Sequence, residues 1–234
     1  IKSYRDSFIG PPTVFLPEHK MATTYQYNSL GQLQKQHTPD GGETRFIYDD
    51  LSRLRFSQNA QQEIDGTFSY TKYDELGRLI EVGLKALNGS SFSSLASQAN
   101  DALYPQNGGS QVTKTVYTDT GPVDYNGKPQ RYLQNRISYT CMDKDGDFSS
   151  TNDQYCTYYS YDAHANVRWM IQDDPRIGKN YLAYEYDLVS GNVLKFRYNE
   201  YRDDRFFHRY TYDAENRITK VETSRDDVLW ERDA

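Results

Sequence analysis

Residues Tyr73–Leu79 read YDELGRL, and variants of this heptapeptide recur along most of the 234-residue chain. Each copy opens with a tyrosine and closes on an aliphatic residue. The other copies are YNSLGQL at 27–33, YDDLSRL at 48–54, YDAHANV at 161–167, YDLVSGNV at 186–193 and YDAENRI at 212–218. A weaker copy begins at Tyr117, and its second half, Asn135-Arg136-Ile137, follows an insertion. Repetition every roughly 20–50 residues is typical of proteins in which each repeat is one small supersecondary unit.

The residues around each heptapeptide predict a β-hairpin. Aromatic residues stand two apart before the turn, so both rings lie on one face of a strand and can pair across strands. These pairs are Tyr25 with Tyr27, Phe46 with Tyr48, Tyr159 with Tyr161, Tyr184 with Tyr186, and Tyr210 with Tyr212. The Asp or Asn that follows can start a turn by bonding to the backbone two residues on. Residues that tolerate positive φ come late in the turns, namely Gly31, Gly77, Gly191 and Asn216. We therefore expect an all-β fold of repeated antiparallel hairpins.

The composition fits thin sheets better than a disordered chain. The mean hydropathy of −0.90 alone favours disorder, but 15% of the residues are aromatic and 22 are tyrosines. Tyrosine combines a large ring with a polar tip and suits sheet faces that remain partly wet. The net charge of −6 argues against a nucleic-acid surface. No apolar run reaches the roughly 18 residues that a membrane-spanning helix needs.

The chain reads as one repeat unit with a lead-in and two insertions. Residues 1–22 are rich in proline and predict an extended lead-in, whereas 23–234 form the repeat segment. The first insertion, 84–110, contains small and apolar residues at helical spacing after Ser91, which predicts one short helix near 92–103. The second insertion, 142–154, is an acidic loop. Both ends of the chain are expected to be cuts through a longer polypeptide.

The two cysteines bracket the acidic loop. Cys141 and Cys156 each lie next to a β-like segment, and they could face each other if these segments pair. A disulfide that closes a loop of this size contributes about 3 kcal/mol in the chain-entropy description. The alternative is two unlinked thiols in a reducing compartment. We favour the disulfide, because the loop between the cysteines is the least apolar part of the chain.

The acidic loop itself is a weak candidate for calcium. Asp143, Asp145 and Asp147 have the spacing of the first ligands in a calcium-binding loop. Phe148 then stands where a sharp turn needs glycine, and Gln154 stands where the bidentate glutamate belongs. A solvated turn is therefore the favoured interpretation. The four histidines show no metal-ligand spacing, and no cofactor is expected.

No residue pattern indicates an enzyme. The serines lack a Gly-x-Ser-x-Gly elbow, and the chain has no glycine-rich phosphate loop. Asp173-Asp174-Pro175 could be a labile bond, but a turn is the favoured interpretation. Trp169 and Trp230 could be exposed platforms for sugars or peptides, although aromatic rings that recur with every repeat are better explained as ladders between hairpins.

The heptapeptides resemble the YD repeats of the Rhs family, which teneurins and the C subunits of insecticidal toxin complexes share. The resemblance spans residues 23–224 with gaps at 84–110 and 121–154. The residues that carry it are Tyr27, Tyr48, Asp49, Arg53, Tyr73, Asp74, Gly77, Arg78, Tyr161, Asp162, Tyr186, Asp187, Tyr212, Asp213 and Arg217. Asn28 and Thr118 depart from the pattern at the Asp position, as Asn166 and Asn192 do at the Arg position.

The resemblance implies hairpins that spiral into a hollow, β-solenoid-like shell. In bacterial relatives such a shell encloses a polymorphic C-terminal toxin domain, and the proteins are secreted or displayed at the cell surface. We expect a non-catalytic piece of shell wall, whose partners are neighbouring repeats, the enclosed toxin domain and the export machinery. The alternative is a surface module whose outer face recognises carbohydrate or a receptor. The self-cleaving core region of such shells has no counterpart in the sequence.

Overall fold

The computed structural model of the chain describes residues 21–106, 109–148 and 153–232. Fifteen strands form one sheet in chain order, and a separate two-stranded hairpin is inserted between the seventh and eighth strands of that sheet. Every pairing is antiparallel, as in the adjacent pairs at both ends of the sheet. The predicted all-β fold is confirmed. The expected lead-in at 1–22 lies outside the described residues except for its last two.

The strands of the large sheet, in order, are β1 Thr24–Tyr27, β2 Leu33–Thr38, β3 Gly42–Tyr48, β4 Leu54–Gln58, β5 Thr67–Tyr73, β6 Leu79–Ala86, β7 Ser110–Tyr117, β10 Ile137–Asp143, β11 Gln154–Tyr161, β12 Val167–Asp174, β13 Gly178–Tyr186, β14 Val193–Tyr198, β15 Phe206–Tyr212, β16 Ile218–Ser224 and β17 Glu231–Arg232. The separate hairpin pairs β8, Asp124–Tyr125, with β9, Lys128–Pro129. The two short helices are α1, Ala60–Ile64, and η1, a 3₁₀ helix at Phe92–Gln98.

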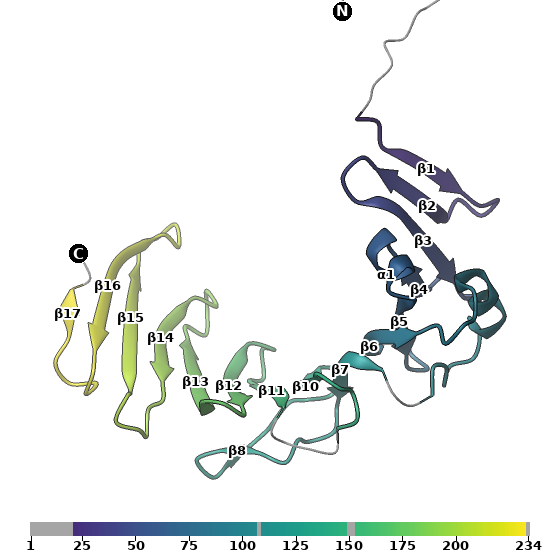
Figure 1. Ribbon diagram of the computed structural model, residues 1–234. Coiled ribbons are helices and arrows are strands. Elements are labelled where there is room, and N and C mark those ends of the chain that lie inside the picture. Colours follow the sequence, from purple (N-terminus) through teal and green to yellow (C-terminus); the bar gives the residue numbers. More distant parts are fainter. Residues whose placement is uncertain (1–20, 107–108, 149–152, 233–234) are drawn as a thin grey trace, which may run out of the picture.

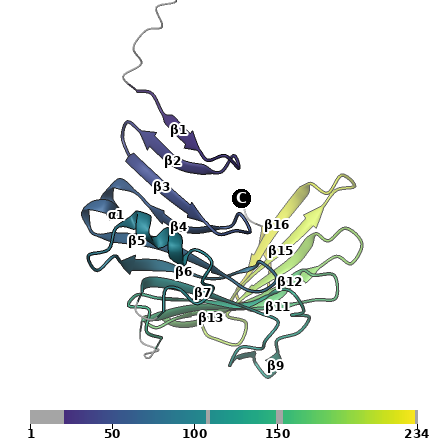
Figure 2. The ribbon, with the colours of Figure 1, turned by 90° about the vertical axis from the view of Figure 1, so that its right-hand side faces the viewer.

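Each copy of the heptapeptide joins the two strands of one hairpin, as predicted. The hairpins are β1–β2, β3–β4, β5–β6, β7–β10, β11–β12, β13–β14 and β15–β16. Because neighbouring strands alternate in direction, every heptapeptide turn lies on the same edge of the sheet (Figure 2). We call this edge the YD edge. The connections between hairpins lie on the opposite edge.

Each of the seven hairpins of the large sheet carries a β-bulge beside its turn. In β3–β4, Tyr48 pairs with Leu54 and Ile47 pairs with Phe56, so Arg55 has no partner across the strand. The same register shift occurs next to the repeat tyrosine in the other six hairpins. A bulge bends its strand and increases the local twist. Repeated at each hairpin, it favours the open arc into which the sheet curves (Figure 1).

The outer, convex face of the arc is covered in two places. The segment between β6 and β7 packs over Phe56, Phe68 and Tyr70, and the β8–β9 hairpin, which hangs outside the arc in Figure 1, packs over β11–β13. These covers produce the two buried clusters of the molecule. In the first, Phe56 and Phe68 are fully buried, and in the second Trp169 stacks against Tyr125 with ring centroids 5.9 Å apart.

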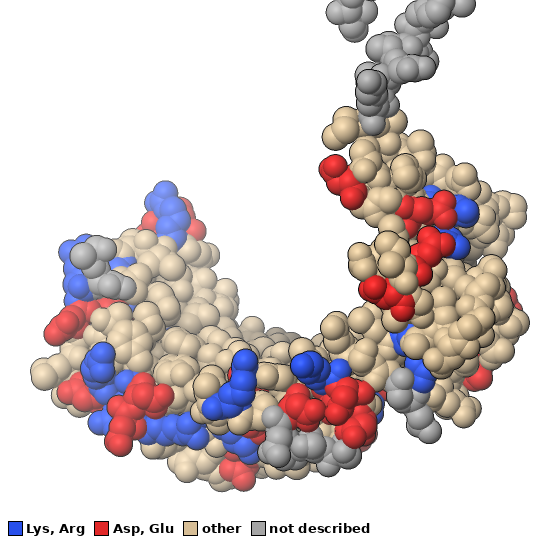
Figure 3. All heavy atoms as spheres, viewed as in Figure 1, with Lys and Arg blue, Asp and Glu red and all other residues tan. Residues whose placement is uncertain are grey.

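The two faces of the sheet differ in charge. On the outer face, opposite charges neighbour one another across strands, as in the Lys35–Glu43 and Lys72–Glu81 ion pairs. On the inner face, aromatic rings form a ladder from Tyr184 through Phe196 to His208. The strand registers place the Lys, Arg and Glu residues of the described strands β2–β16 on the outer face. In Figure 3 the floor of the arc is accordingly mostly tan, and charged side chains gather on its outer rim.

The first insertion is shorter than expected, and its helix differs in kind. Strand β6 continues to Ala86 and β7 begins at Ser110, so the insertion proper is 87–109. The helix begins at Phe92 as predicted, but it is a 3₁₀ helix that ends at Gln98. The Ser94 hydroxyl donates to the Ser91 carbonyl at 2.6 Å, and such side-chain bonds compete with regular α-helical bonding.

The short helix α1 was not predicted. Its signal is a capping box, in which the Asn59 side chain accepts from the Gln62 N–H while the Gln62 side chain accepts from the Asn59 N–H. In the described part of the chain, no helix is long and apolar enough to cross a membrane.

Candidate functional site

The recurring site of this molecule is the turn at the YD edge together with the next hairpin along the chain. In the turn after β3, the Asp49 side chain accepts from the N–H groups of Leu51 and Arg53. Its second oxygen accepts from Arg53 Nε at 2.7 Å. The Asp49 N–H donates to the Arg53 carbonyl at 3.0 Å, which closes the loop. One carboxylate therefore accepts from two backbone N–H groups and from the arginine of the turn.

Two further turns repeat this bonding closely. The Arg Nε to Asp Oδ2 distance is 2.7 Å at Arg78–Asp74 and at Arg217–Asp213. Where the sequence departs from the pattern, the turn keeps its shape with weaker partners. Asn166 donates its side-chain amide to Asp162 at 3.1 Å, and the longer turn after Tyr186 uses Ser190 to bond Asp187.

The position before the Arg requires positive φ. Gly31, Gly77, Gly191 and Asn216 have φ values of 76°, 78°, 75° and 61°, as the sequence predicts. Ser52 and Ala165 adopt the same conformation, with φ of 62° and 75°. Because a side chain makes this region unfavourable by about 1–2 kcal/mol, the turn bonds of Asp49 and Asp162 must offset that cost.

In two of the complete turns the arginine also contacts the tyrosine that opens the next copy. The guanidinium carbon of Arg53 lies 4.9 Å from the Tyr73 ring centroid, and that of Arg78 lies 4.3 Å from the Tyr117 ring. Arg136, which ends the weaker copy, lies 5.4 Å from the Tyr161 ring. These cation–π contacts join successive turns along the YD edge.

The tyrosine hydroxyl completes the connection by donating to the preceding hairpin. In five junctions its acceptor is the carbonyl of the aliphatic residue that closes the preceding copy. The bonds are Tyr73 to Leu54 at 3.0 Å, Tyr117 to Leu79 at 3.1 Å, Tyr161 to Ile137 at 2.9 Å, Tyr186 to Val167 at 3.0 Å and Tyr212 to Val193 at 2.8 Å. We call the set of Asp, Arg, aliphatic carbonyl and next tyrosine the YD junction.

Loss of one junction hydroxyl tests the value of this bond. Tyr186→Phe removes the donor to the Val167 carbonyl and should lower the free energy of unfolding by about 1 kcal/mol. Tyr27→Phe is the matched control, since Tyr27 is 60% exposed and follows no hairpin among the described residues. Urea unfolding measures both changes. Equal effects of the two substitutions would argue against the junction.

Hydrogen bonds within the turns lower the pKa of three of the turn carboxylates. Burial alone acts to raise the pKa of Asp74, but hydrogen bonds from the Arg78 backbone and side chain outweigh it and hold this pKa below its ordinary value of 3.8. The same balance lowers the pKa of Asp162, through Asn166, and of Asp213, through Arg217. Burial raises the pKa of Tyr186, with a contribution from Tyr184, so its hydroxyl remains a donor at neutral pH.

These shifts predict acid sensitivity. Each of these three carboxylates has a lower pKa in the folded than in the unfolded chain, so the unfolded chain binds protons first as the pH falls. The free energy of unfolding should therefore be nearly constant above about pH 5 and fall progressively below about pH 4. Urea midpoints measured across this range provide the test. A midpoint that is unchanged down to about pH 2.5 would contradict a structural role of the turn carboxylates.

Cys141 and Cys156 lie directly opposite each other on β10 and β11 and form a disulfide. It closes the acidic loop and lies in the same buried cluster as Trp169. Replacing both cysteines by serine should lower the free energy of unfolding by about 3 kcal/mol, because the loop becomes unconstrained in the unfolded chain. The measurement is urea unfolding of the double variant. Reduction of the parent protein by dithiothreitol should reproduce the loss. An unchanged urea midpoint in both the double variant and the reduced protein would exclude a stabilising role of the disulfide.

The acidic triad forms a turn. Asp143 is fully buried and accepts from the N–H groups of Asp145, Gly146 and Phe148, whereas Asp145 and Asp147 are exposed. Carboxylate oxygens of the three lie within 4.8 Å of one another. Because the Asp143 oxygens already bind the backbone, the bonding is that of a capped loop. Asp174 likewise accepts from the Arg176 N–H in a turn.

The two aromatic platforms considered for sugar binding differ in exposure. Trp169 is 3% exposed because Tyr125 covers it. Trp230 is half-buried, and Lys195 and Arg209 both lie against its ring. A Trp169→Ala substitution would therefore damage a buried cluster instead of reporting on binding.

One buried arginine of structural importance could not be recognised from the sequence. Arg55, the bulged residue of β4, is 2% exposed. Its guanidinium donates to the Thr71 carbonyl and to the carbonyls of Ala99, Asp101 and Tyr104 in the insertion, at 2.7–2.9 Å. Arg55 thereby holds the insertion on the outer face. Nothing in the local sequence distinguishes it from a solvated arginine.

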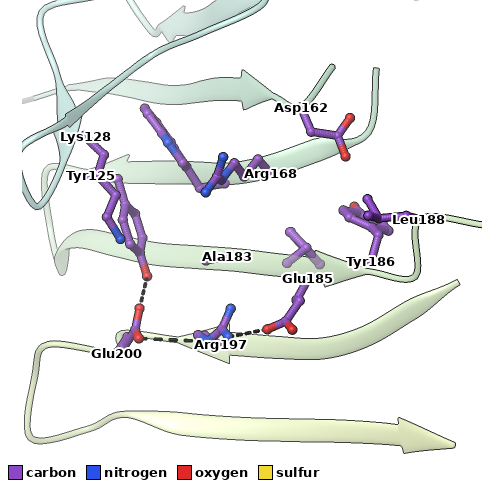
Figure 4. A pocket seen from close by; sticks show the side chains of 12 residues that line it. Tyr125, Lys128, Asp162, Arg168, Ala183, Glu185, Tyr186, Leu188, Arg197 and Glu200 are labelled. Carbon is purple, nitrogen blue, oxygen red and sulfur yellow. Dashed lines mark hydrogen bonds and ion pairs between the residues drawn. The ribbon is translucent and has the colours of Figure 1, made fainter. Parts of the chain in front are cut away.

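An open groove lies farther along the outer face, between the β8–β9 hairpin and β12–β14 (Figure 4). Its volume is about 440 Å³. Glu200 accepts from the Tyr125 hydroxyl at 3.3 Å, and Arg197 pairs with both Glu185 and Glu200. Arg168 also lines the groove and is exposed.

Comparison with known proteins identifies the repeat. Residues 27–58, which span the end of β1 to the end of β4, match the RHS Repeat family. No curated protein sequence matches the chain.

Several solved structures of toxin complexes match the chain at low sequence identity. The Photorhabdus luminescens Tc holotoxin pore, with a mutated TccC3, matches 89% of this chain at 15% identity and a TM-score of 0.38. The TcdB2-TccC3-Cdc42 structure matches 89% of this chain at 15% identity and a TM-score of 0.39. The TcdB2-TccC3-TEV structure matches 89% of this chain at 14% identity and a TM-score of 0.37. The chain spans 11% of the length of each of these proteins.

Proposed function

We propose that this chain, whose residues 27–58 match the RHS Repeat family, is a non-catalytic section of the wall of a hollow β-shell. The observation that carries the proposal is the YD junction. It recurs from hairpin to hairpin with the same bond from tyrosine to carbonyl. Such a junction can add hairpins to a wall without limit, because each copy supplies the acceptor for the next. Residues 23–234 then act as one structural unit.

The shape of the sheet supports the proposed role as a section of a shell wall. The strip is an open arc, and its outermost strands, β1 and β17, each pair on one side only within the described residues. Unpaired strand edges readily accept further strands. Neighbouring repeats of the same longer chain are the natural partners for the unpaired sides of β1 and β17.

The inner face supports enclosure of a polypeptide. Its aromatic and hydroxyl side chains, such as the Tyr184–Phe196–His208 ladder, carry few fixed charges. Such a face offers hydrogen bonds and apolar contact without attracting one particular charge pattern. In keeping with what the resemblance implies, we assign the enclosed cargo as a C-terminal toxin or effector domain of the same polypeptide.

The disulfide supports a location outside the bacterial cytoplasm. Disulfides persist in secreted and surface proteins and are rare in reducing compartments. The proposed protein is therefore secreted or displayed at the bacterial surface, with export machinery as a transient partner. The alternative role is recognition of carbohydrate or a receptor by the outer face. Of its two candidate platforms, Trp169 is buried and Trp230 is half-buried.

Electron microscopy and proteolysis of the full-length protein test this function. The shell should appear as a closed hollow particle, and the C-terminal domain should resist protease until the particle is unfolded. An open strip whose C-terminal domain is digested as fast as the isolated domain would contradict the proposal.

A further inference from the structure

The outer face contains two equivalent binding positions, each formed by a bulged arginine and the buried aromatic residue that follows it. We call each position a seat; a segment of the chain occupies one of the two. Arg55 follows Leu54, and Arg168 follows Val167, so both arginines are the bulged residue directly after a heptapeptide. The residues that follow them, Phe56 and Trp169, are both buried beneath an aromatic ring of a covering segment. The two arginines therefore occupy the same place in their hairpins.

The first seat is filled by the chain itself. Arg55 donates to three carbonyls of the insertion, those of Ala99, Asp101 and Tyr104. Asn100 of the same loop accepts from the Asp50 N–H in the YD turn. An irregular loop that presents several carbonyls to one guanidinium is thus the ligand that this seat accepts.

The second seat is open. The position of Tyr70, which faces Phe56 across the strands, is taken by Ala183, which faces Trp169. The smaller side chain leaves space, and the groove of about 440 Å³ lies over it. No dashed line reaches Arg168 in Figure 4, and Arg168 has no hydrogen bond, ion pair or ring contact to any residue of the described ranges.

The charged side chains that line the groove favour a ligand that carries hydrogen-bond acceptors. Arg197 is paired with Glu185 and Glu200, and the Lys128 ammonium lies near the Tyr201 hydroxyl. The Asp162 carboxylate, which also lines the groove, accepts from Asn166 and from the His164 N–H. Arg168 is therefore the arginine of the lining without a carboxylate partner among the described residues. Leu188, which is 78% exposed, adds an apolar rim at the YD edge. The lining thus combines one unpaired guanidinium, a small apolar floor and an apolar rim.

We propose that this groove binds a loop of another polypeptide, which presents backbone carbonyls and an acidic side chain to Arg168 and an apolar side chain to Ala183. The unpaired positive charge and the loop bound in the equivalent seat both argue for this occupant. Charge-assisted bonds to a guanidinium are strong and geometrically specific. The binding site is on the outer face, so it operates whether or not the arc belongs to a closed shell.

Selection of short random peptides displayed on phage tests the proposal. The whole 234-residue chain is the target, and two variants are used for comparison. Arg168→Gln removes the guanidinium, and Ala183→Tyr restores the side chain that the filled seat has. Enriched peptides should contain Asp or Glu and should bind each variant about tenfold or more weakly, by fluorescence anisotropy. Circular dichroism confirms that the variants are folded, and Arg168→Gln is decisive by itself because its side chain is exposed.

Arg225→Gln is the matched control. Arg225 is also exposed, but it does not line the groove, so this substitution should leave peptide affinity unchanged. A selection that enriches no peptide sensitive to Arg168→Gln would overturn the proposal. So would displacement of the peptides by a free acidic sugar with equal dependence on Arg168, because the site would then be a saccharide site.

Discussion

Asp49→Ala should lower the free energy of unfolding by about 2–4 kcal/mol, one of the two largest effects expected for a single substitution in this chain. The Asp49 side chain is 4% exposed and accepts from Arg53 Nε and from two backbone N–H groups. Its removal leaves these donors without a partner, and a buried partnerless group costs more than the net value of the bond it lost. Ser52, held at φ of 62°, loses its local support at the same time.

Asp213→Ala is the matched control. Asp213 makes the same bonds with Arg217 at the same 2.7 Å, but the two side chains are 24% and 73% exposed. Water can replace the lost bonds there, so the expected loss is much smaller than for Asp49→Ala. Urea unfolding of the two variants gives the difference. If both lose the same amount, burial does not decide the strength of the turn.

Arg55→Met should lower the free energy of unfolding by about 3–5 kcal/mol and release the insertion from the outer face. Methionine retains apolar volume, but it leaves the carbonyls of Thr71, Ala99, Asp101 and Tyr104 without their donor. Because this segment covers Phe56 and Phe68, its release also exposes the first buried cluster. Limited proteolysis should then cut within the insertion before the strands are digested.

Arg168→Met provides the comparison at the equivalent bulge. Arg168 is exposed and makes no bond within the described residues, so the substitution should change stability by about 0.5 kcal/mol or less. The two variants remove the same side chain from the same place in the repeat. Equal stability of both variants would refute the view that Arg55 fastens the insertion.

The sequence was sufficient for those features that depend on neighbours in the chain. The Asp, the positive-φ residue and the Arg of each heptapeptide bond to one another within five residues, so their spacing alone predicts the turn. Aromatic residues two apart likewise predict the strands and the face that they share. The helix near Phe92 was predicted in place, although its serines favour a 3₁₀ helix.

Features that depend on distant contacts could not be predicted. Arg55 meets the insertion 44–49 residues away, and Tyr125 covers Trp169 from a separate hairpin. In the sequence, Trp169 therefore looks as suitable for an exposed platform as for a core. The junction tyrosines could be predicted only in part. Their recurrence is visible, but the carbonyl that each one binds appears only when the hairpins are placed side by side.

Bulge and junction together explain how a repeated sequence yields a curved wall. The bulge beside each turn bends and twists its own hairpin, and the junction fixes the distance to the next hairpin at the YD edge alone. The opposite edge is free to differ in length and carries insertions such as 87–109. A strip of this kind can therefore vary its outer surface while it keeps one inner face.

Thiol labelling of the full-length protein tests the proposed wall most directly. Ile218→Cys and Lys220→Cys lie on the same strand, and the bulge between them places Ile218 on the inner face and Lys220 on the outer face. Both side chains are exposed in the described chain. A closed shell predicts that a large polyethylene-glycol maleimide modifies the Lys220→Cys variant rapidly, and the Ile218→Cys variant only after denaturation. Equal labelling of both variants in the folded full-length protein would show that the inner face is open to solvent, and would contradict the shell.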